Sequence, residues 1–164
     1  MKGMIVYSFG WRRKDYGPCN VLLAMAAKRI IQDEKEQVLV FAQRSIAVIL
    51  KEFGVKCDVS QKQAGGYEGS EEPTRQACEI FQKRNIKVVI PVAQPFLHLT
   101  KCIRLIRKQG LTTISYYKLA RKIGWIGFDS LSVQPATRSP FKLLFYAVRQ
   151  IFFGYRLPFE QSEP

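Results

Sequence analysis

The only histidine in the chain, His98, carries the side chain best suited to moving protons near neutral pH. It follows residues 88–92, VVIPV, whose β-branched side chains predict a strand buried on both faces. A helix is predicted next, because apolar residues recur at i, i+3, i+4 and i+7 (Leu99, Cys102, Ile103 and Ile106) before Gly110. His98 is therefore expected in a first helical turn, at the rim where α/β sheets bind ligands. There it would act as a general acid or base; capping its own helix or filling a polar gap are the alternatives.

More polar side chains are expected at the same rim, because the loops that follow parallel strands meet at one edge of the sheet. Helices that begin there place partial positive charge at the rim, which suits phosphate or carboxylate groups, and arginines would strengthen such a site. The alternatives are favourable first-turn charges for the glutamates and solvated side chains for the arginines. The residues expected at the rim are Ser8, Gly10, Arg12, Arg13, Asp15, Gln43, Arg44, Ser45, Glu68, Glu71, Glu72, Gln94, His98 and Lys101.

Two of these residues, His98 and Glu72, are expected to carry any catalysis, with the glutamate orienting the ligand or accepting a proton. Ligand binding is assigned to Gly10, Arg12, Arg44, Ser45, Gln94 and Lys101. No metal site is expected, because the chain has one histidine and its four cysteines (Cys19, Cys57, Cys78 and Cys102) lack metal-ligand spacing. The usual nucleotide fingerprints, G-x-G-x-x-G and the P-loop, are absent, and so is the G-x-S-x-G nucleophile elbow. The cofactor therefore stays unknown.

The elements that would position these residues alternate between strand and helix patterns. This alternation predicts an α/β fold, a Rossmann-like three-layer sandwich with a mostly parallel five-stranded sheet and helices on both faces. The whole chain, residues 1–164, is expected to form one domain. Pro91 is expected to end its strand, because proline removes a ladder donor. Strands are predicted at residues 4–9, 38–42, 55–59, 88–91 and 111–115, and helices at 18–32, 46–53, 72–85, 98–109 and 140–154.

The last of these helices is apolar almost all round, with Ser139 as its N-cap and Pro140 at its first position. A helix apolar on every side is usually buried, so we expect it to pack against the sheet. The alternative is that it docks on a membrane surface or a partner, since basic residues flank it. The preceding stretch, residues 116–138, is expected to be a functional loop or to contain a short element of its own.

The composition is that of a globular protein with a strong excess of positive charge. Apolar residues make up 47% of the 164, and 26 Lys and Arg against 13 Asp and Glu give a net charge of +13. Such a balance favours anionic partners, although a solvated basic surface explains it equally well. No signal peptide is recognised, and no run reaches the about 18 apolar residues of a spanning helix. We therefore expect a cytoplasmic protein, with peripheral membrane contact as an alternative.

The segment PFLHLTKCIRLIRKQG resembles the ElyC/SanA/YdcF family of bacterial domains, whose biochemistry is largely unassigned. His98 matches the family histidine, Lys101 stands where arginine is usual, and residues 104–107, RLIR, continue the match. Residues 72–77, EPTRQA, resemble the family's N-T-x-x-N-A helix start, and residues 129–154 resemble its closing loop and helix. The resemblance implies a Rossmann-like domain and a link to bacterial envelope processes.

This sequence departs from the family pattern at several functional positions. Residues 43–45, QRS, replace an S-G-G turn, Glu72 and Gln76 replace asparagines, and Gln150 replaces a glutamate. The chain is therefore interpreted as a divergent member for which the fold is implied more strongly than an activity.

These observations predict a domain that binds a small anionic ligand, phosphate-bearing or nucleotide-like, at the rim, with transfer or hydrolysis as the expected reaction classes. The alternative is a catalytically inactive protein that engages a membrane surface or a protein partner through its basic face and C-terminal helix. Nucleic-acid binding is a third and weaker hypothesis, because a solvated helix face accounts for the basic residues of 101–108 equally well. The ligand, the reaction and the oligomeric state stay open.

Overall fold

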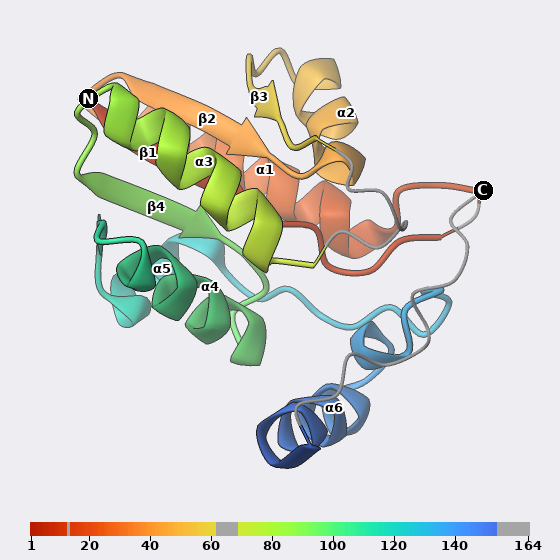
Figure 1. Ribbon diagram of the computed structural model, residues 1–164. Helices are drawn as coiled ribbons and strands as arrows, with labels where there is room; N and C mark the ends of the chain where they lie inside the picture. Colours follow the sequence, from red (N-terminus) through yellow and green to blue (C-terminus); the bar gives the residue numbers. More distant parts are fainter. Residues whose placement is uncertain (13, 62–68, 154–164) are drawn as a thin grey trace.

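The computed structural model describes residues 1–12, 14–61 and 69–153, and within them strands and helices alternate as expected (Figure 1). The described residues form five strands, six α-helices and one 3-10 turn, η1, which precedes the last helix. Their bounds are β1 Lys2–Val6, α1 Pro18–Asp33, β2 Val38–Ala42, α2 Arg44–Glu52, β3 Asp58–Val59, α3 Glu71–Lys83, β4 Val88–Val92, α4 Leu97–Lys108, β5 Thr112–Thr113, α5 Tyr116–Ile123, η1 Pro135–Thr137 and α6 Pro140–Phe153.

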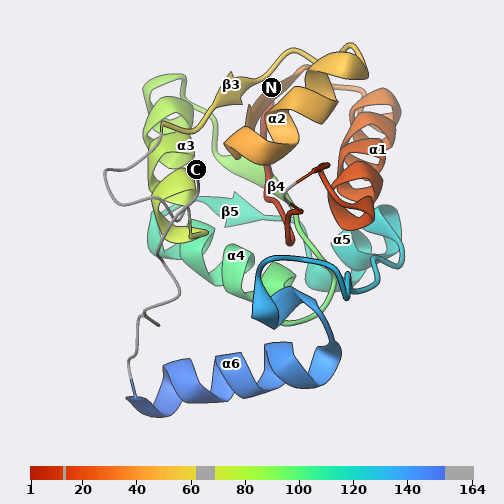
Figure 2. The ribbon, with the colours of Figure 1, turned by 90° about the vertical axis from the view of Figure 1, so that its right-hand side faces the viewer.

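The strands form one sheet in the order β3-β2-β1-β4-β5, and every pair of neighbours is parallel. Met4 of the central strand lies opposite Val40 on one side and Ile90 on the other, and all three side chains are buried. Helices α1, α2 and α5 cover one face, and α3 and α4 cover the other (Figures 1 and 2). The predicted Rossmann-like α/β sandwich is confirmed.

The centre of the sheet is packed closely against α3. A Cβ atom on Gly3 would lie 2.7 Å from Cε2 of the buried Phe81 ring, so the absence of a side chain lets the ring rest on the strand. Replacing this glycine would force the helix away from the sheet.

Strand β4 does not end at Pro91, as the sequence suggested, but continues to Val92. The N–H group of Tyr7 donates to the Val92 carbonyl at 2.9 Å, so the backbone of Val92 faces β1. The nitrogen of Pro91 therefore faces the opposite side, where β5 pairs only with Val88 and Val89. The missing donor costs no ladder hydrogen bond, which explains why proline is tolerated.

The prediction that the last helix packs against the sheet is wrong. Helix α6 contacts η1 and α4 and lies at the edge of the molecule, beyond α4 (Figures 1 and 2). Phe141 and Phe145 are 82% and 68% exposed. The physical reason is that five other helices already cover both faces of the sheet. Along the described parts of the chain, none of the helices is long and apolar enough to cross a membrane.

Candidate functional site

The rim beyond the carboxyl ends of β1 and β4 is the topological switch point of the sheet. These strands are neighbours, but the chain leaves β1 toward α1 on one face and leaves β4 toward α4 on the other. The point where such connections diverge is the place at which open α/β sheets bind ligands. The site is therefore built from the residues that follow β1, β2 and β4 and precede α3.

His98 lies in the first turn of α4, as expected, and shares a hydrogen bond with Ser70, which immediately precedes α3. His98 Nε2 and Ser70 Oγ are 3.0 Å apart. The imidazole stacks on Phe9 at 5.7 Å between ring centroids and meets the edge of Tyr7 at 5.9 Å. Burial, with a smaller contribution from Lys101, lowers the pKa of His98 to about 4. The imidazole is therefore neutral at pH 7 and can accept a proton.

The second ring nitrogen of His98 has an unusual environment. Nδ1 is buried and has no hydrogen-bond partner among the described residues. A buried polar atom without a partner is costly, and in a native protein it commonly marks a position that a water or ligand satisfies. This nitrogen is therefore a candidate contact for a ligand at the rim.

Ser70 is held in place from the opposite side by two buried hydroxyl groups. Thr74 Oγ1 donates to the Ser70 carbonyl at 2.5 Å and lies 2.7 Å from the Tyr7 hydroxyl. Tyr7 is completely buried, and this burial raises the pKa of its hydroxyl well above the ordinary value, so the group stays protonated and donates. The end of β1 and the start of α3 are thus fixed relative to each other.

Gln43 connects the end of β2 to the same place. Its Oε1 accepts hydrogen bonds from the backbone and hydroxyl of Ser8, at 2.7 and 3.1 Å, and its Nε2 donates to the Gly69 carbonyl at 3.4 Å. Helix α2 begins at the next residue, so the exposed Arg44 and the half-buried Ser45 stand beside these contacts. We refer to Tyr7, Ser8, Gln43, Ser70, Thr74 and His98 as the rim network.

Asn20 shapes the loop that follows β1, and the sequence reading did not identify this role. Its Oδ1 accepts from the Phe9 N–H at 2.8 Å, while its Nδ2 donates to the carbonyls of Gly10 and Tyr16, at 2.6 and 2.8 Å. Helix α1 begins at Pro18, as predicted, so Asn20 lies within its first turn. An amide among the apolar residues of a helix was the available signal, because a buried amide must find partners.

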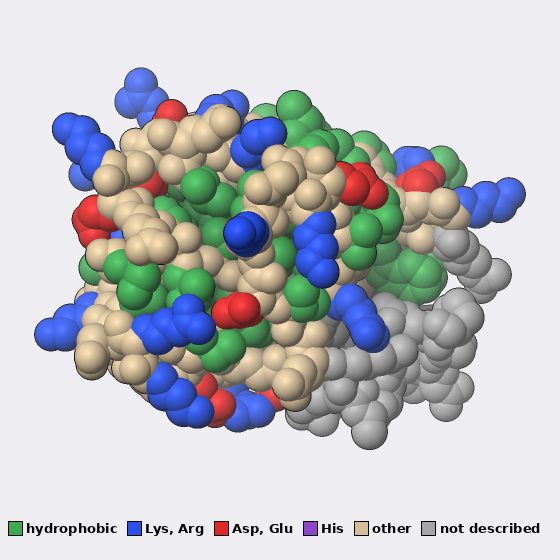
Figure 3. Space-filling model, turned by 90° about the horizontal axis from the view of Figure 1, so that it is seen from above, with side chains coloured by type: hydrophobic (Ala, Val, Ile, Leu, Met, Phe, Trp, Pro, Cys, Tyr) green, Lys and Arg blue, Asp and Glu red, His purple; other side chains and the backbone are tan. Residues whose placement is uncertain are grey.

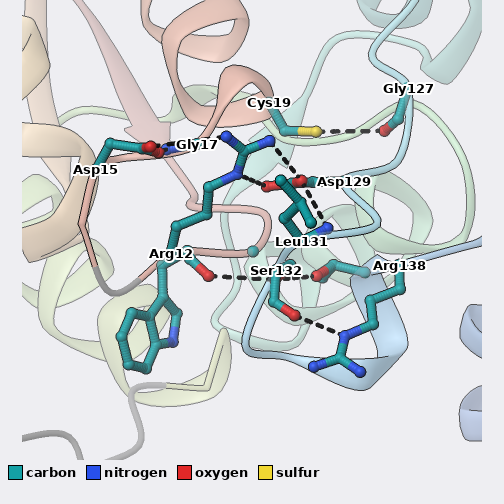
Figure 4. Close-up of polar contacts among 12 residues, drawn as sticks. Arg12, Asp15, Gly17, Cys19, Gly127, Asp129, Leu131, Ser132 and Arg138 are labelled. Carbon is teal, nitrogen blue, oxygen red and sulfur yellow. Dashed lines mark hydrogen bonds and ion pairs between the residues drawn. The ribbon is translucent and has the colours of Figure 1, made fainter.

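Two residues predicted to bind the ligand, Gly10 and Arg12, lie against residues 129–138 in the structure, and Figure 4 shows the contacts of Arg12. Arg12 donates from Nε and Nη2 to the two carboxylate oxygens of Asp129, each at 2.8 Å, and this pairing lowers the pKa of Asp129. A Cβ atom on Gly10, where φ is +77°, would lie 2.7 Å from Thr137 Oγ1. Both residues thus fasten the loop after β1 to residues 129–138.

The remaining predicted residues have other partners. Gln94 is buried and donates from Nε2 to the Ile126 carbonyl at 3.2 Å, while its Oε1 has no partner among the described residues. Glu72 accepts hydrogen bonds from Arg75, at 2.5 and 2.9 Å, and this pairing lowers its pKa. Lys101 Nζ lies 3.7 Å from Glu71 Oε1.

Several further expectations concern the same rim. Ser8 belongs to the rim network, whereas Asp15 Oδ2 lies 3.6 Å from Arg12 Nη1. Arg13 and Glu68 lie outside the described residues. In the part of the chain that the structure describes, no three His, Cys, Asp or Glu side chains gather as metal ligands would.

The comparisons with known proteins add no assignment. The chain matches no protein-family model, and no curated protein is similar to it at a significant level. The resemblance described for residues 94–110 therefore stays a prediction, and the site has to be interpreted from its own chemistry.

Proposed function

We propose that this protein binds a small anionic ligand, phosphate-bearing or nucleotide-like, at the rim beside the Ser70–His98 pair, and that this pair supports transfer or hydrolysis. The single observation that carries the proposal is the 3.0 Å contact between Ser70 Oγ and His98 Nε2 at the switch point of the sheet. A hydroxyl next to a neutral imidazole is the arrangement that activates serine as a nucleophile.

The start of α2 supplies groups suited to an anion. The backbone N–H groups of its first turn carry partial positive charge, and Arg44 adds a full charge on an exposed side chain. Helix α3 is less suitable, because Glu71 and Glu72 occupy its first turn. We therefore place the anionic group of the ligand toward Arg44 and Ser45 and its reacting atom toward Ser70.

The low pKa of His98 defines what the imidazole can do. With a pKa of about 4 the ring is a neutral proton acceptor at pH 7 rather than a cation that attracts phosphate. An anion bound nearby favours the protonated ring and raises this pKa. His98 would then take the Ser70 proton as the Oγ atom attacks, and would return it to the leaving group.

A ligand screen by thermal unfolding tests the proposal. Nucleotides, nucleotide sugars and inorganic phosphate are added to the full chain, and at least one is expected to raise the unfolding temperature in a saturable manner. The stabilisation should be reduced by Arg44→Gln and by His98→Gln. Lys51→Gln is the matched control, because Lys51 is an exposed cation at the other end of α2.

Two results would contradict the proposal. One is the absence of saturable stabilisation by every compound in a folded protein. The other is a stabilisation that Arg44→Gln and Lys51→Gln reduce equally, since this would indicate general charge attraction rather than a site at the rim.

A further inference from the structure

Helix α6 exposes one continuous apolar stripe, which consists of Phe141, Leu144, Phe145 and Val148 and is called the α6 stripe below. These side chains are 82%, 48%, 68% and 42% exposed and follow the i, i+3, i+4, i+7 spacing of a single helix face. Leu143, on the other side of the helix, is buried. The helix contacts η1 and α4, and the side chains of the α6 stripe remain exposed.

The orientation of α6 makes this stripe accessible. Figures 1 and 2 show α6 at the lower edge of the molecule, with no other helix or strand beyond it. Exposed contiguous apolar patches on a folded protein mark sites of interaction with proteins, ligands or membranes. The chemistry around the stripe has to indicate which kind of surface it meets.

The excess of basic over acidic residues lies mostly in the half of the sequence that contains α6. Residues 80–153 contain 13 Lys and Arg but a single acidic residue, Asp129, whereas residues 1–79 contain 12 basic and 10 acidic residues. Asp129 is itself buried and paired with Arg12. The basic half therefore has a single acidic side chain of its own, and two of its lysines, Lys101 and Lys122, pair with Glu71 and Glu34 of the other half.

The elements next to the stripe follow this pattern. Helix α4, which packs on α6, has no acidic residue and exposes Arg104, Arg107 and Lys108. Lys142 is exposed on α6 itself. By contrast, the upper face in Figure 3 intersperses Lys and Arg with acidic and neutral side chains. Helix α6 thus carries an exposed cation of its own, and the helix that it contacts has basic but no acidic side chains.

We propose that α6 docks on the surface of an anionic lipid bilayer, with the α6 stripe in the outer acyl region and the neighbouring lysines and arginines on the headgroups. An apolar stripe within a basic surface is the pattern of helices that lie in the membrane interface. A second copy of this chain is disfavoured as the occupant, because a symmetric contact would bring two cationic surfaces together. A nucleic acid would use the charge but not the stripe.

Vesicle co-sedimentation of the full chain tests this proposal. We expect the protein to sediment with vesicles of phosphatidylcholine mixed with phosphatidylglycerol, to bind phosphatidylcholine alone much more weakly, and to be released by salt. Phe141→Ser combined with Phe145→Ser should weaken binding to the mixed vesicles about tenfold or more. The matched control combines Tyr117→Ser with Trp125→Ser, which removes two aromatic side chains that are 84% and 81% exposed outside α6, and should bind as the unaltered protein does.

A second measurement does not depend on the loss of binding. In Phe145→Trp, the added fluorescence should shift to the blue with the mixed vesicles and be quenched by brominated acyl chains, relative to the unaltered protein with its own Trp11 and Trp125. Helix folding is checked by circular dichroism. The ligand response at the rim should be unchanged in Phe141→Ser combined with Phe145→Ser, so that this proposal and the proposed function fail separately.

Four results would overturn the membrane proposal. These are the absence of vesicle binding, equal binding to both kinds of vesicle, binding that the stripe substitutions leave intact, and concentration-dependent self-association that the same substitutions abolish. The last result would assign the stripe to a second copy of the chain.

Discussion

At the rim between β1 and β4, polar side chains are buried and joined by hydrogen bonds, whereas α6 leaves large apolar side chains in water. Tyr7 and Asn20 are completely buried, while Phe141 is 82% exposed. Burying a polar group costs free energy unless it is paired, and exposing an apolar group costs free energy unless something covers it. At the rim most of these polar groups are paired within the molecule, with His98 Nδ1 and Gln94 Oε1 as the exceptions among the described residues. Helix α6 keeps its large apolar side chains exposed, which is why we infer a partner outside the chain.

The largest effect is expected where the buried polar groups of the rim lose a partner. Asn20→Ala removes the acceptor of the Phe9 N–H and the donor to the Gly10 carbonyl, and both of these residues are buried. We expect a loss of about 4 kcal/mol in the free energy of unfolding, because two buried backbone groups become unsatisfied. Urea denaturation measures this loss, and a change below about 1 kcal/mol would show that water replaces the amide.

His98 is expected to make a contribution of similar size to the free energy of unfolding, but one that depends on pH. Its pKa in the folded protein, about 4, lies below the ordinary value of 6.5, so the unfolded chain takes up the proton first as the pH falls. The stability is therefore complete above pH 6.5 and is lost between pH 6.5 and 4, by an amount on the order of 3 kcal/mol.

The variant His98→Gln separates this contribution from that of the carboxylates. The pKa values of Asp129 and Glu34 are lowered by pairing, so their contributions are lost at still lower pH, and equally in both proteins. The difference in unfolding free energy between the two proteins should narrow between pH 6.5 and 4. Parallel curves of unfolding free energy against pH would contradict the neutral state of His98 in the folded protein.

A smaller effect is expected from one hydroxyl group of the rim network. Tyr7→Phe removes the group that lies 2.7 Å from Thr74 Oγ1 and should lower the free energy of unfolding by about 1 kcal/mol. Tyr117→Phe removes a hydroxyl from a side chain that is 84% exposed and serves as the control, with no measurable effect. Equal effects of the two substitutions would remove the distinction between rim and surface.

The smallest effect on stability is expected in α6. Phe145→Ser should change the free energy of unfolding by less than about 0.5 kcal/mol, because this side chain is 68% exposed. Thermal unfolding measures the change. A loss of 2 kcal/mol or more would mean that the α6 stripe is covered by the chain itself, and would weaken the comparison between the two regions.

The elements were predictable where local sequence patterns determine them. The strand at residues 38–42 has the predicted bounds, and the helix predicted at 18–32 ends one residue later, at Asp33. Buried parallel strands and amphipathic helices carry their signal within a few residues. The position of α6 was not predictable in this way, because it depends on how many other helices already cover the sheet.

The site was predictable in its location but not in its partnerships. The strand-turn-helix pattern placed His98 in the first turn of α4, whereas its partner Ser70 is 28 residues away in the sequence. Arg12 and Asp129 are 117 residues apart in the sequence, and no local sequence pattern predicts their ion pair. Side-chain pairs between distant segments depend on how loops dock, so the sequence indicated candidate residues without showing which of them were already engaged.

The proline in β4 has a consequence for how the protein behaves at high concentration. Both outer strands of the sheet, β3 and β5, are only two residues long, and Pro91 offers no N–H group on the side where β5 would have to extend. Intermolecular β-pairing, the first step toward fibrils, needs a longer row of free backbone groups than these strands present. A sheet whose inner strands are apolar and rich in β-branched residues is in this way prevented from growing by the addition of another molecule.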